Sequence, residues 1–181
     1  MPLYFVTGIS GSGKSTVREH LRRRGYDAYA TDEDGLASWF DNVTEQEYAR
    51  HTTSAERTPE FGQRYSWRMP RSRAAQLAAI AADRPVFLCG AVANEVESWD
   101  LFAAVIALHI DAETLQMRLA ARTNNDFGKS AHELTQILGW QAAAGAAYER
   151  AGHLVIDATR PIEDVVDEVL ALTVERQRAS D

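Results

Sequence analysis

The feature that most constrains the fold of this chain is a glycine-rich segment at residues 8–15, which reads GISGSGKS. It fits the pattern GxxxxGK(S/T) of a phosphate-binding loop. The apolar run at residues 3–6 indicates a short buried strand before the loop, and residues 16–21 continue as a helix after it. The strand, loop and helix that this motif requires are therefore all present, and the sequence predicts binding of a nucleoside triphosphate.

The residue types in the segment explain how it would hold phosphate. Gly8, Gly11 and Gly13 lack a Cβ atom and tolerate positive φ, so successive backbone N–H groups can turn inward around an anion. Lys14 supplies a positive charge for the β- and γ-phosphates, and Ser15 supplies a hydroxyl for Mg²⁺. The positive N-terminus of the helix also faces the anion. The predicted nucleotide-binding residues here are Gly8, Ser10, Gly11, Ser12, Gly13, Lys14, Ser15 and Thr16.

Composition limits the classes of partner. The net charge of −7 argues against broad affinity for nucleic acids or membrane surfaces, because both are anionic. No apolar run approaches the roughly 20 residues needed to cross a bilayer, and residues 1–3 lead straight into the first strand without a basic leader. We therefore expect a soluble cytoplasmic protein with no nucleic-acid or membrane partner, folded as a single domain over residues 1–181. The oligomeric state stays open.

Cysteine and histidine chemistry is not indicated. The single cysteine, Cys89, lies at the end of an apolar run, where a buried and unreactive thiol is expected. The five histidines show no metal-ligand spacing, so a zinc site is not predicted.

Strand and helix patterns alternate along the rest of the chain. The first helix is expected to end near Gly25. We expect further strands at residues 26–30, 85–89, 103–110 and 153–157, and further helices at about 71–81, 112–122, 130–150 and from Pro161 onward. This alternation predicts an α/β fold, with a parallel sheet, right-handed crossovers and helices on both faces.

Residues 35–73 are the least regular part and form the expected acceptor-binding segment. We expect a short helix over residues 36–40 and a helix-capping box from Thr44 to Glu47. Arg64 and Arg68, at helical spacing, are candidate substrate ligands.

Two tryptophans of this segment, Trp39 and Trp67, are read either as core anchors or as platforms on which a substrate stacks. Trp39 is included among the candidate substrate-binding residues. The mixture of aromatic residues and arginines at residues 64–73 favours a nucleotide or nucleoside as the acceptor.

An acidic cluster, Asp32-Glu33-Asp34, follows the second strand. Ligands of open α/β sheets bind at the carboxyl ends of the strands, so the cluster should lie beside the phosphate-binding loop. Asp32 is the candidate to orient Mg²⁺ or to accept a proton from a substrate hydroxyl, with Asp34 as the second candidate for the substrate site. If Asp32 is a base, the acceptor is expected to be a hydroxylated metabolite or antibiotic, because a hydroxyl group must lose its proton. The alternative for these acids is a solvated turn with a helix cap.

With the loop on its first strand and Arg118 and Arg122 after its fourth, the chain resembles the P-loop kinases of small molecules. This group includes the nucleoside monophosphate, shikimate and gluconate kinases. The polar segment at residues 123–129 and the strand-turn-proline pattern at residues 157–161 strengthen the resemblance.

The resemblance implies a three-layer P-loop NTPase fold with a five-stranded parallel sheet, ordered 2-3-1-4-5, and a small mobile lid that closes over ATP. The lid would cover residues 118–130. In such kinases an arginine at the start of the lid, here Arg118 or Arg122, contacts phosphates or stacks on adenine. The turn after the fifth strand, with Arg160 and Pro161, would border the adenine.

The sequence thus predicts a kinase that uses ATP and Mg²⁺ to phosphorylate a small-molecule acceptor, a nucleotide, nucleoside or hydroxylated metabolite. The expected catalytic residues are Lys14, Asp32, Arg118 and Arg122, and Ser15 and Asp32 are the expected metal ligands. Two alternatives stay open. One is a non-catalytic or regulatory ATP-binding protein with the same loop. The other is a GTPase-type switch, because residues 32–35 read DxxG, although the chain has no NKxD motif.

Overall fold

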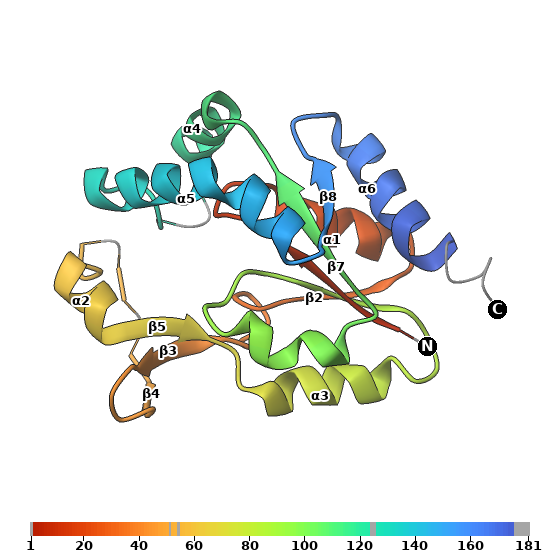
Figure 1. Ribbon diagram of the computed structural model, residues 1–181, viewed down its shortest axis with the longest axis horizontal. Helices are drawn as coiled ribbons and strands as arrows, with labels where there is room; N and C mark the ends of the chain where they lie inside the picture. The colour runs from red at the N-terminus through yellow and green to blue at the C-terminus, as the bar shows by residue number, and fades with distance from the viewer. Residues whose placement is uncertain (1, 51, 54, 124–125, 176–181) are drawn as a thin grey trace.

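The computed structural model describes residues 2–50, 52–53, 55–123 and 126–175. Its centre is a parallel sheet, shown in Figure 1, whose strands are β1 (Leu3–Thr7), β2 (Asp27–Ala30), β6 (Val86–Cys89), β7 (Ala104–His109) and β8 (Leu154–Asp157). Across the sheet the order is β2-β6-β1-β7-β8. Counted along the chain, these parallel strands run 2-3-1-4-5. The predicted parallel α/β sheet is confirmed.

The two central strands are buried along their whole length, which explains their continuous apolar sequences. Leu3 pairs with Val86 and Tyr4 with Ala104, so β1 lies between β6 and β7. Cys89 at the end of β6 is buried, and burial raises the pKa of its thiol to about 12. The thiol is therefore protonated at neutral pH, as an unreactive cysteine should be.

Helices cover both faces of this sheet. Alternate residues of a strand point to opposite faces. Tyr4 and Val6 share a core with α1 (Lys14–Arg23) and α6 (Ile162–Leu170), which pack against each other. Leu3 and Phe5 share a second core with α3 (Arg71–Ile80). The remaining helical elements are α2 (Pro59–Arg64), η1 (Glu95–Leu101), α4 (Ala112–Ala121), α5 (Ala131–Arg150) and η2 (Ala171–Glu175).

No helix within the described ranges is long and apolar enough to span a membrane.

A second, antiparallel sheet departs from the prediction. It has the order β4-β3-β5, with β3 (Ser38–Asp41), β4 (Glu47–Tyr48) and β5 (Tyr65–Arg68), and with α2 it projects to the left in Figure 1. The predicted helix over residues 36–40 is wrong because residues 38–41 form β3. The predicted capping box is also wrong, because Thr44 lies in a turn and Glu47 begins β4.

Long-range pairing is the physical reason for these errors. Trp39 lies opposite Trp67 and Asp41 lies opposite Tyr65, so β3 is stabilised by a strand far along the chain. A short apolar segment does not show by its own pattern whether it is helix or strand. The helical spacing of Arg64 and Arg68 is likewise not realised, since Arg64 ends α2 and Arg68 ends β5.

Candidate active site

The glycine-rich segment forms a tight loop between β1 and α1. Gly8, Gly11 and Gly13 have φ of 148°, 89° and 105°, values that residues with a Cβ rarely adopt. A Cβ on Gly8 would lie 2.7 Å from the carbonyl oxygen of Leu108. Lys14 Nζ donates to the carbonyl oxygens of Gly8 at 2.7 Å and of Ile9 at 2.8 Å, so the ammonium group is folded back over its own loop.

Burial and two neighbouring charges set the protonation of Lys14. Burial lowers the pKa of Lys14 to about 8, against the raising effect of Asp32, while Arg122 lowers it further. Asp32 and Arg122 therefore both act on the lysine at this loop. A bound triphosphate would favour the charged lysine, because an anion next to an ammonium group raises its pKa.

This pKa predicts how ATP binding depends on pH. In the free protein Lys14 is protonated below about pH 8 and loses its proton above it, whereas the phosphates require the charged form. ATP affinity should therefore be constant below pH 8 and fall above it, by up to about tenfold per pH unit. Isothermal titration calorimetry in buffers of different ionisation enthalpy should detect uptake of about one proton on binding near pH 9. Constant affinity without proton uptake would contradict the prediction.

The structure brings both predicted arginines to the loop. Arg118 Nη1 donates to the Ser12 carbonyl oxygen at 3.1 Å, and its Nη2 donates to the Ala158 carbonyl oxygen at 2.8 Å. Arg118 thus ties the loop to the turn after β8. Arg122 Nη1 donates to Ser10 Oγ at 3.1 Å, and burial lowers the pKa of its guanidinium group.

The start of α4 explains the placement of this arginine pair. Asp111 caps the helix, because its Oδ1 accepts from the Thr114 backbone N–H at 2.7 Å. Arg118 lies in the last turn of α4 and Arg122 is its C-terminal cap, and residues four apart lie on the same side of a helix.

The acids after β2 have separate environments. Asp32 Oδ1 accepts from Thr31 Oγ1 at 2.8 Å and from Trp67 Nε1 at 3.0 Å; neither bond occupies Oδ2. Asp34 instead accepts from the Ala30 backbone N–H at 2.6 Å and from Arg22 at 3.1 Å. Asp32 therefore faces Lys14, whereas Asp34 braces the end of β2.

Two further carboxylates lie at the loop, and the sequence analysis gave neither of them a role. Ser15 Oγ donates to Glu33 Oε1 at 3.1 Å. Thr7, the last residue of β1, donates through its Oγ1 to Glu95 at 3.2 Å, and burial raises the pKa of Glu95. Both glutamates follow the carboxyl end of a parallel strand, β2 or β6. Their position after a strand end, where ligands of such sheets bind, could have identified both glutamates as site candidates from the sequence.

The oxygen atoms around Ser15 fit a magnesium ion. The described residues contain no group of three or more His, Cys, Asp or Glu side chains placed to hold a metal. Mg²⁺ in phosphoryl-transfer sites, however, takes most of its ligands from phosphates and water, and one or two from the protein. Ser15 Oγ beside the carboxylate of Glu33, with Asp32 near Lys14, provides oxygen ligands of this kind.

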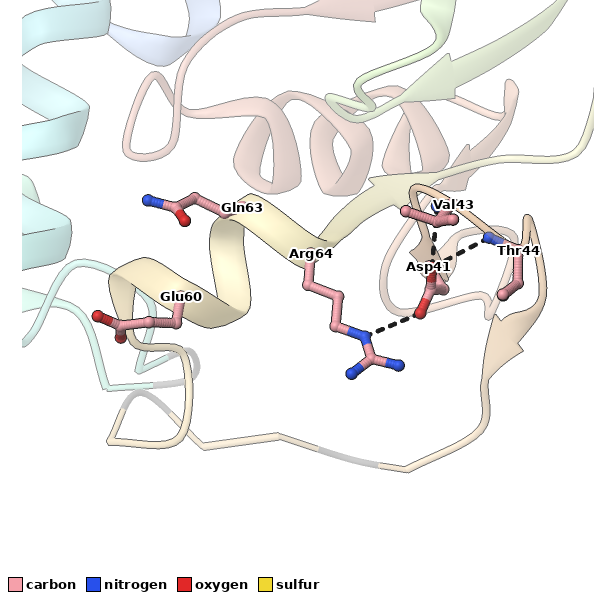
Figure 2. A pocket seen from close by; sticks show the side chains of 6 residues that line it. All are labelled: Asp41, Val43, Thr44, Glu60, Gln63 and Arg64. Atoms are coloured by element: carbon pink, nitrogen blue, oxygen red, sulfur yellow. Dashed lines mark hydrogen bonds and ion pairs between the residues drawn. The ribbon is translucent and has the colours of Figure 1, made fainter.

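Arg64 is engaged away from the loop. Figure 2 shows it reaching toward Asp41 across a pocket of about 460 Å³, and Arg64 Nε lies 2.9 Å from Asp41 Oδ2. Bonds from the Val43 and Thr44 backbone N–H groups, together with Arg64, lower the pKa of Asp41 to about 2. The predicted substrate ligand Arg64 thus stabilises the turn after β3.

Arg68 is also engaged within the small sheet. It donates to Ser66 Oγ at 2.7 Å and to Asn42 Oδ1 at 2.9 Å. The structure does not bring this predicted ligand to the phosphate-binding loop. Trp39 packs edge-on against Trp67, with ring centroids 5.3 Å apart, and Trp67 in turn bonds Asp32.

One arginine joins the predicted acceptor-binding segment to residues in and just after the predicted lid. Arg57 Nε donates to Glu133 Oε1 at 2.8 Å and its Nη2 donates to Asp126 at 2.7 Å. Glu133 Oε2 also accepts from the Gly128 backbone N–H at 2.9 Å. The predicted lid includes Asn124 and Asn125, which lie outside the described residues.

Lys129 of the predicted lid range and the two residues predicted to border the adenine lie at the edges of the site. Lys129 Nζ donates to the carbonyl oxygens of Leu119 and Ala120, so it caps α4. Arg160 donates to the Asp157 carbonyl oxygen at 3.0 Å and pairs with Glu168. Pro161 lies three residues after Ala158 and is the N-terminal cap residue of α6.

The parallel sheet, the loop and the two arginines define a P-loop nucleotide-binding protein of the α/β class. A family model described as an AAA domain matches residues 5–139, which is more than half of the chain. The chain therefore belongs to the AAA domain family. A comparison with curated proteins finds no match.

Several solved structures share the fold. A shikimate kinase from Acinetobacter baumannii in complex with shikimate has a TM-score of 0.61 and 18% identity, with 97% of this chain and 94% of that chain covered. A gluconokinase from Sinorhizobium meliloti 1021 has a TM-score of 0.53 and 22% identity, with 99% and 98% covered. A sugar kinase from Janibacter sp. HTCC2649 has a TM-score of 0.54 and 20% identity, with 94% and 93% covered. At these identities the similarity shows that this chain has the fold of P-loop small-molecule kinases.

Proposed function

We propose that this protein is a kinase that transfers the γ-phosphoryl group of ATP to a small-molecule acceptor, with Mg²⁺ as cofactor. The observation that carries the proposal is the meeting of Lys14, Asp32 and Arg122 at the phosphate-binding loop. Lys14 binds phosphate, Asp32 can accept a proton, and Arg122 can stabilise charge on the transferred group. Phosphoryl transfer requires this set more than it requires covalent chemistry. The shared fold of the shikimate kinase and the gluconokinase supports the same class.

The residues of the loop bind the donor. Backbone N–H groups of residues 8–15 and the ammonium group of Lys14 hold the phosphates, and Ser15 is a ligand for the metal. When bound, ATP supplies the phosphoryl group, and Mg²⁺ offsets the negative charge of the phosphates. Arg118 orders the loop against the turn at Ala158, where the resemblance puts the adenine.

Asp32 serves the acceptor. Its Oδ1 accepts from Thr31 and Trp67, and its Oδ2 would accept the proton of the acceptor hydroxyl group. As the acceptor oxygen forms its bond to phosphorus, the bond from phosphorus to the ADP oxygen breaks. The hydroxyl proton passes to Asp32. Arg122 stabilises the charge on the equatorial oxygens during this step.

An ADP-release screen tests the proposed function. Nucleoside monophosphates, nucleosides, sugar acids, shikimate-like alcohols, neutral sugars and aminoglycosides are incubated with the protein, ATP and Mg²⁺, and ATP alone is the control. We expect one chemical class to raise ADP release at least about tenfold above the control, because acceptor-dependent turnover defines a kinase. Binding of ATP without acceptor-dependent ADP release from any class would instead support a non-catalytic ATP-binding protein.

A further inference from the structure

A second pocket, of about 290 Å³, lies between the acceptor segment and the lid. Trp39 of β3 and Phe61 of α2 line it on one side, and Phe127 of the lid segment and the first turns of α5 line it on the other. The three aromatic rings provide flat apolar faces, which favour a ligand that is itself a ring. The polar groups in the wall include the neutral amides of Gln63 and Gln136, which can bond hydroxyl groups.

The arginine of this pocket is already paired within the protein. Arg57 lines it, and all three of its guanidinium nitrogens donate to the protein: Nε to Glu133, Nη2 to Asp126 and Nη1 to the Thr52 carbonyl oxygen at 2.7 Å. The Arg57 side chain is 10% exposed and that of Glu133 is 1% exposed. An anionic ligand that displaced Glu133 from this arginine would leave a buried carboxylate without its counter-charge, which is strongly unfavourable.

Two tryptophans that pack edge-on link the wall of the pocket to Asp32. Trp39 lines the pocket and packs edge-on against Phe61 at 5.0 Å and against Trp67 at 5.3 Å. Trp67 Nε1 then donates to Asp32 Oδ1 at 3.0 Å. Trp39 of the pocket wall is therefore one ring contact away from the indole that holds Asp32.

We propose that the pocket lined by Trp39, Phe61 and Phe127 binds the phosphoryl acceptor, and that this acceptor is an uncharged ring compound with a hydroxyl group. This inference rests on the proposed function, because it names the chemical class of the second substrate. It excludes nucleotides and acids as preferred acceptors. The arginines that would have favoured an anionic acceptor, Arg64 and Arg68, bind groups within the small sheet.

Matched pairs of ligands that differ only in an anionic group test the charge preference. We choose uridine and uridine monophosphate, methyl shikimate and shikimate, and methyl glucoside and the corresponding glucuronide. Binding to the full chain is measured by isothermal titration calorimetry, with Mg²⁺ and a non-hydrolysable ATP analogue present. In each pair that binds, the neutral member should bind at least about tenfold more tightly than the anionic member, which would leave a buried carboxylate unpaired. Tighter binding of the anionic members, or no binding of any neutral member, would overturn the inference.

Variants of the aromatic wall test the location. Trp39→Leu and Phe61→Leu should each weaken binding of the neutral ligand about tenfold, since each removes one aromatic face. Tyr48→Leu is the matched control: Tyr48 packs edge-on against Phe61 at 5.8 Å but does not line the pocket, so binding should change less than about twofold. Unchanged binding in both wall variants would overturn the location.

The same samples separate this inference from the proposed function. ADP release with acidic acceptors alone would leave the kinase function standing and would overturn the neutral class. Binding of neutral alcohols in the pocket without ADP release from any acceptor would refute the kinase function, and the acceptor role of the pocket with it.

Discussion

Replacement of Lys14 by alanine is expected to lower acceptor-dependent turnover at least about a hundredfold, because loss of one preorganised group that stabilises developing charge costs about this much or more. ATP affinity should fall as well. Lys14 Nζ bonds the carbonyl oxygens of Gly8 and Ile9 and lies under the influence of Asp32 and Arg122. Alanine would remove the only ammonium group on the loop that can face the β- and γ-phosphates.

The chain offers a matched control for this experiment. Lys129 is the one other lysine in the sequence, and it caps α4 through the carbonyl oxygens of Leu119 and Ala120. Lys129→Ala should therefore change turnover by less than about threefold, since a C-terminal cation contributes only about 0.3–1 kcal/mol. Turnover and ATP affinity are measured for both variants in parallel. If the Lys14→Ala variant binds and turns over ATP like the wild type, the proposed nucleotide site is contradicted.

Asp32→Asn is expected to lower transfer to a hydroxyl acceptor about a hundredfold to ten thousandfold, the range that a general base contributes. Asparagine keeps an oxygen that can accept from Thr31 and Trp67, so the local structure should persist. It cannot take up the hydroxyl proton. ATP affinity should stay within about threefold of the wild type, because the phosphates are held by the loop and Lys14.

Asp34→Asn is the matched control for Asp32. Asp34 accepts from the Ala30 backbone and from Arg22, so its substitution should lower the free energy of unfolding by about 1–3 kcal/mol while the turnover of folded protein changes little. Thermal unfolding and steady-state kinetics of both variants give the comparison. If Asp32→Asn turns over a hydroxyl acceptor at the wild-type rate, Asp32 is not the base.

Sequence reasoning worked where function depends on neighbours along the chain. Residues 8–15 contain the glycines, the lysine and the serine of the loop in one run, and the strand before it is buried as expected. The N-cap of α4 at Asp111 is local in the same way, because it is a contact between residues three apart. Alternating strands and helices then limited the fold to a parallel sheet.

Sequence reasoning failed where a contact joins distant parts of the chain. The small sheet was missed because β3 is stabilised by β5, which is far along the chain. The short apolar run of β3 does not by itself distinguish a strand from a helix. Arg64 and Arg68 were predicted to bind substrate because arginines commonly bind anions, and the sequence could not show that Asp41 and Asn42 engage them. Glu33 and Glu95 were passed over because their contacts with Ser15 and Thr7 depend on how the strand ends meet.

The sequence by itself determined the phosphate-binding loop, because such a loop is made by local backbone geometry and its own side chains. Only the tertiary structure decided the surroundings of the residues proposed to serve the acceptor. There the environment of each group is set by partners far away in sequence: Trp67 orients Asp32, and Glu133 and Asp126 balance the charge of Arg57. Burial and pairing of charges are properties of the folded chain, and they determine whether an arginine can bind an anion or stabilises the protein instead.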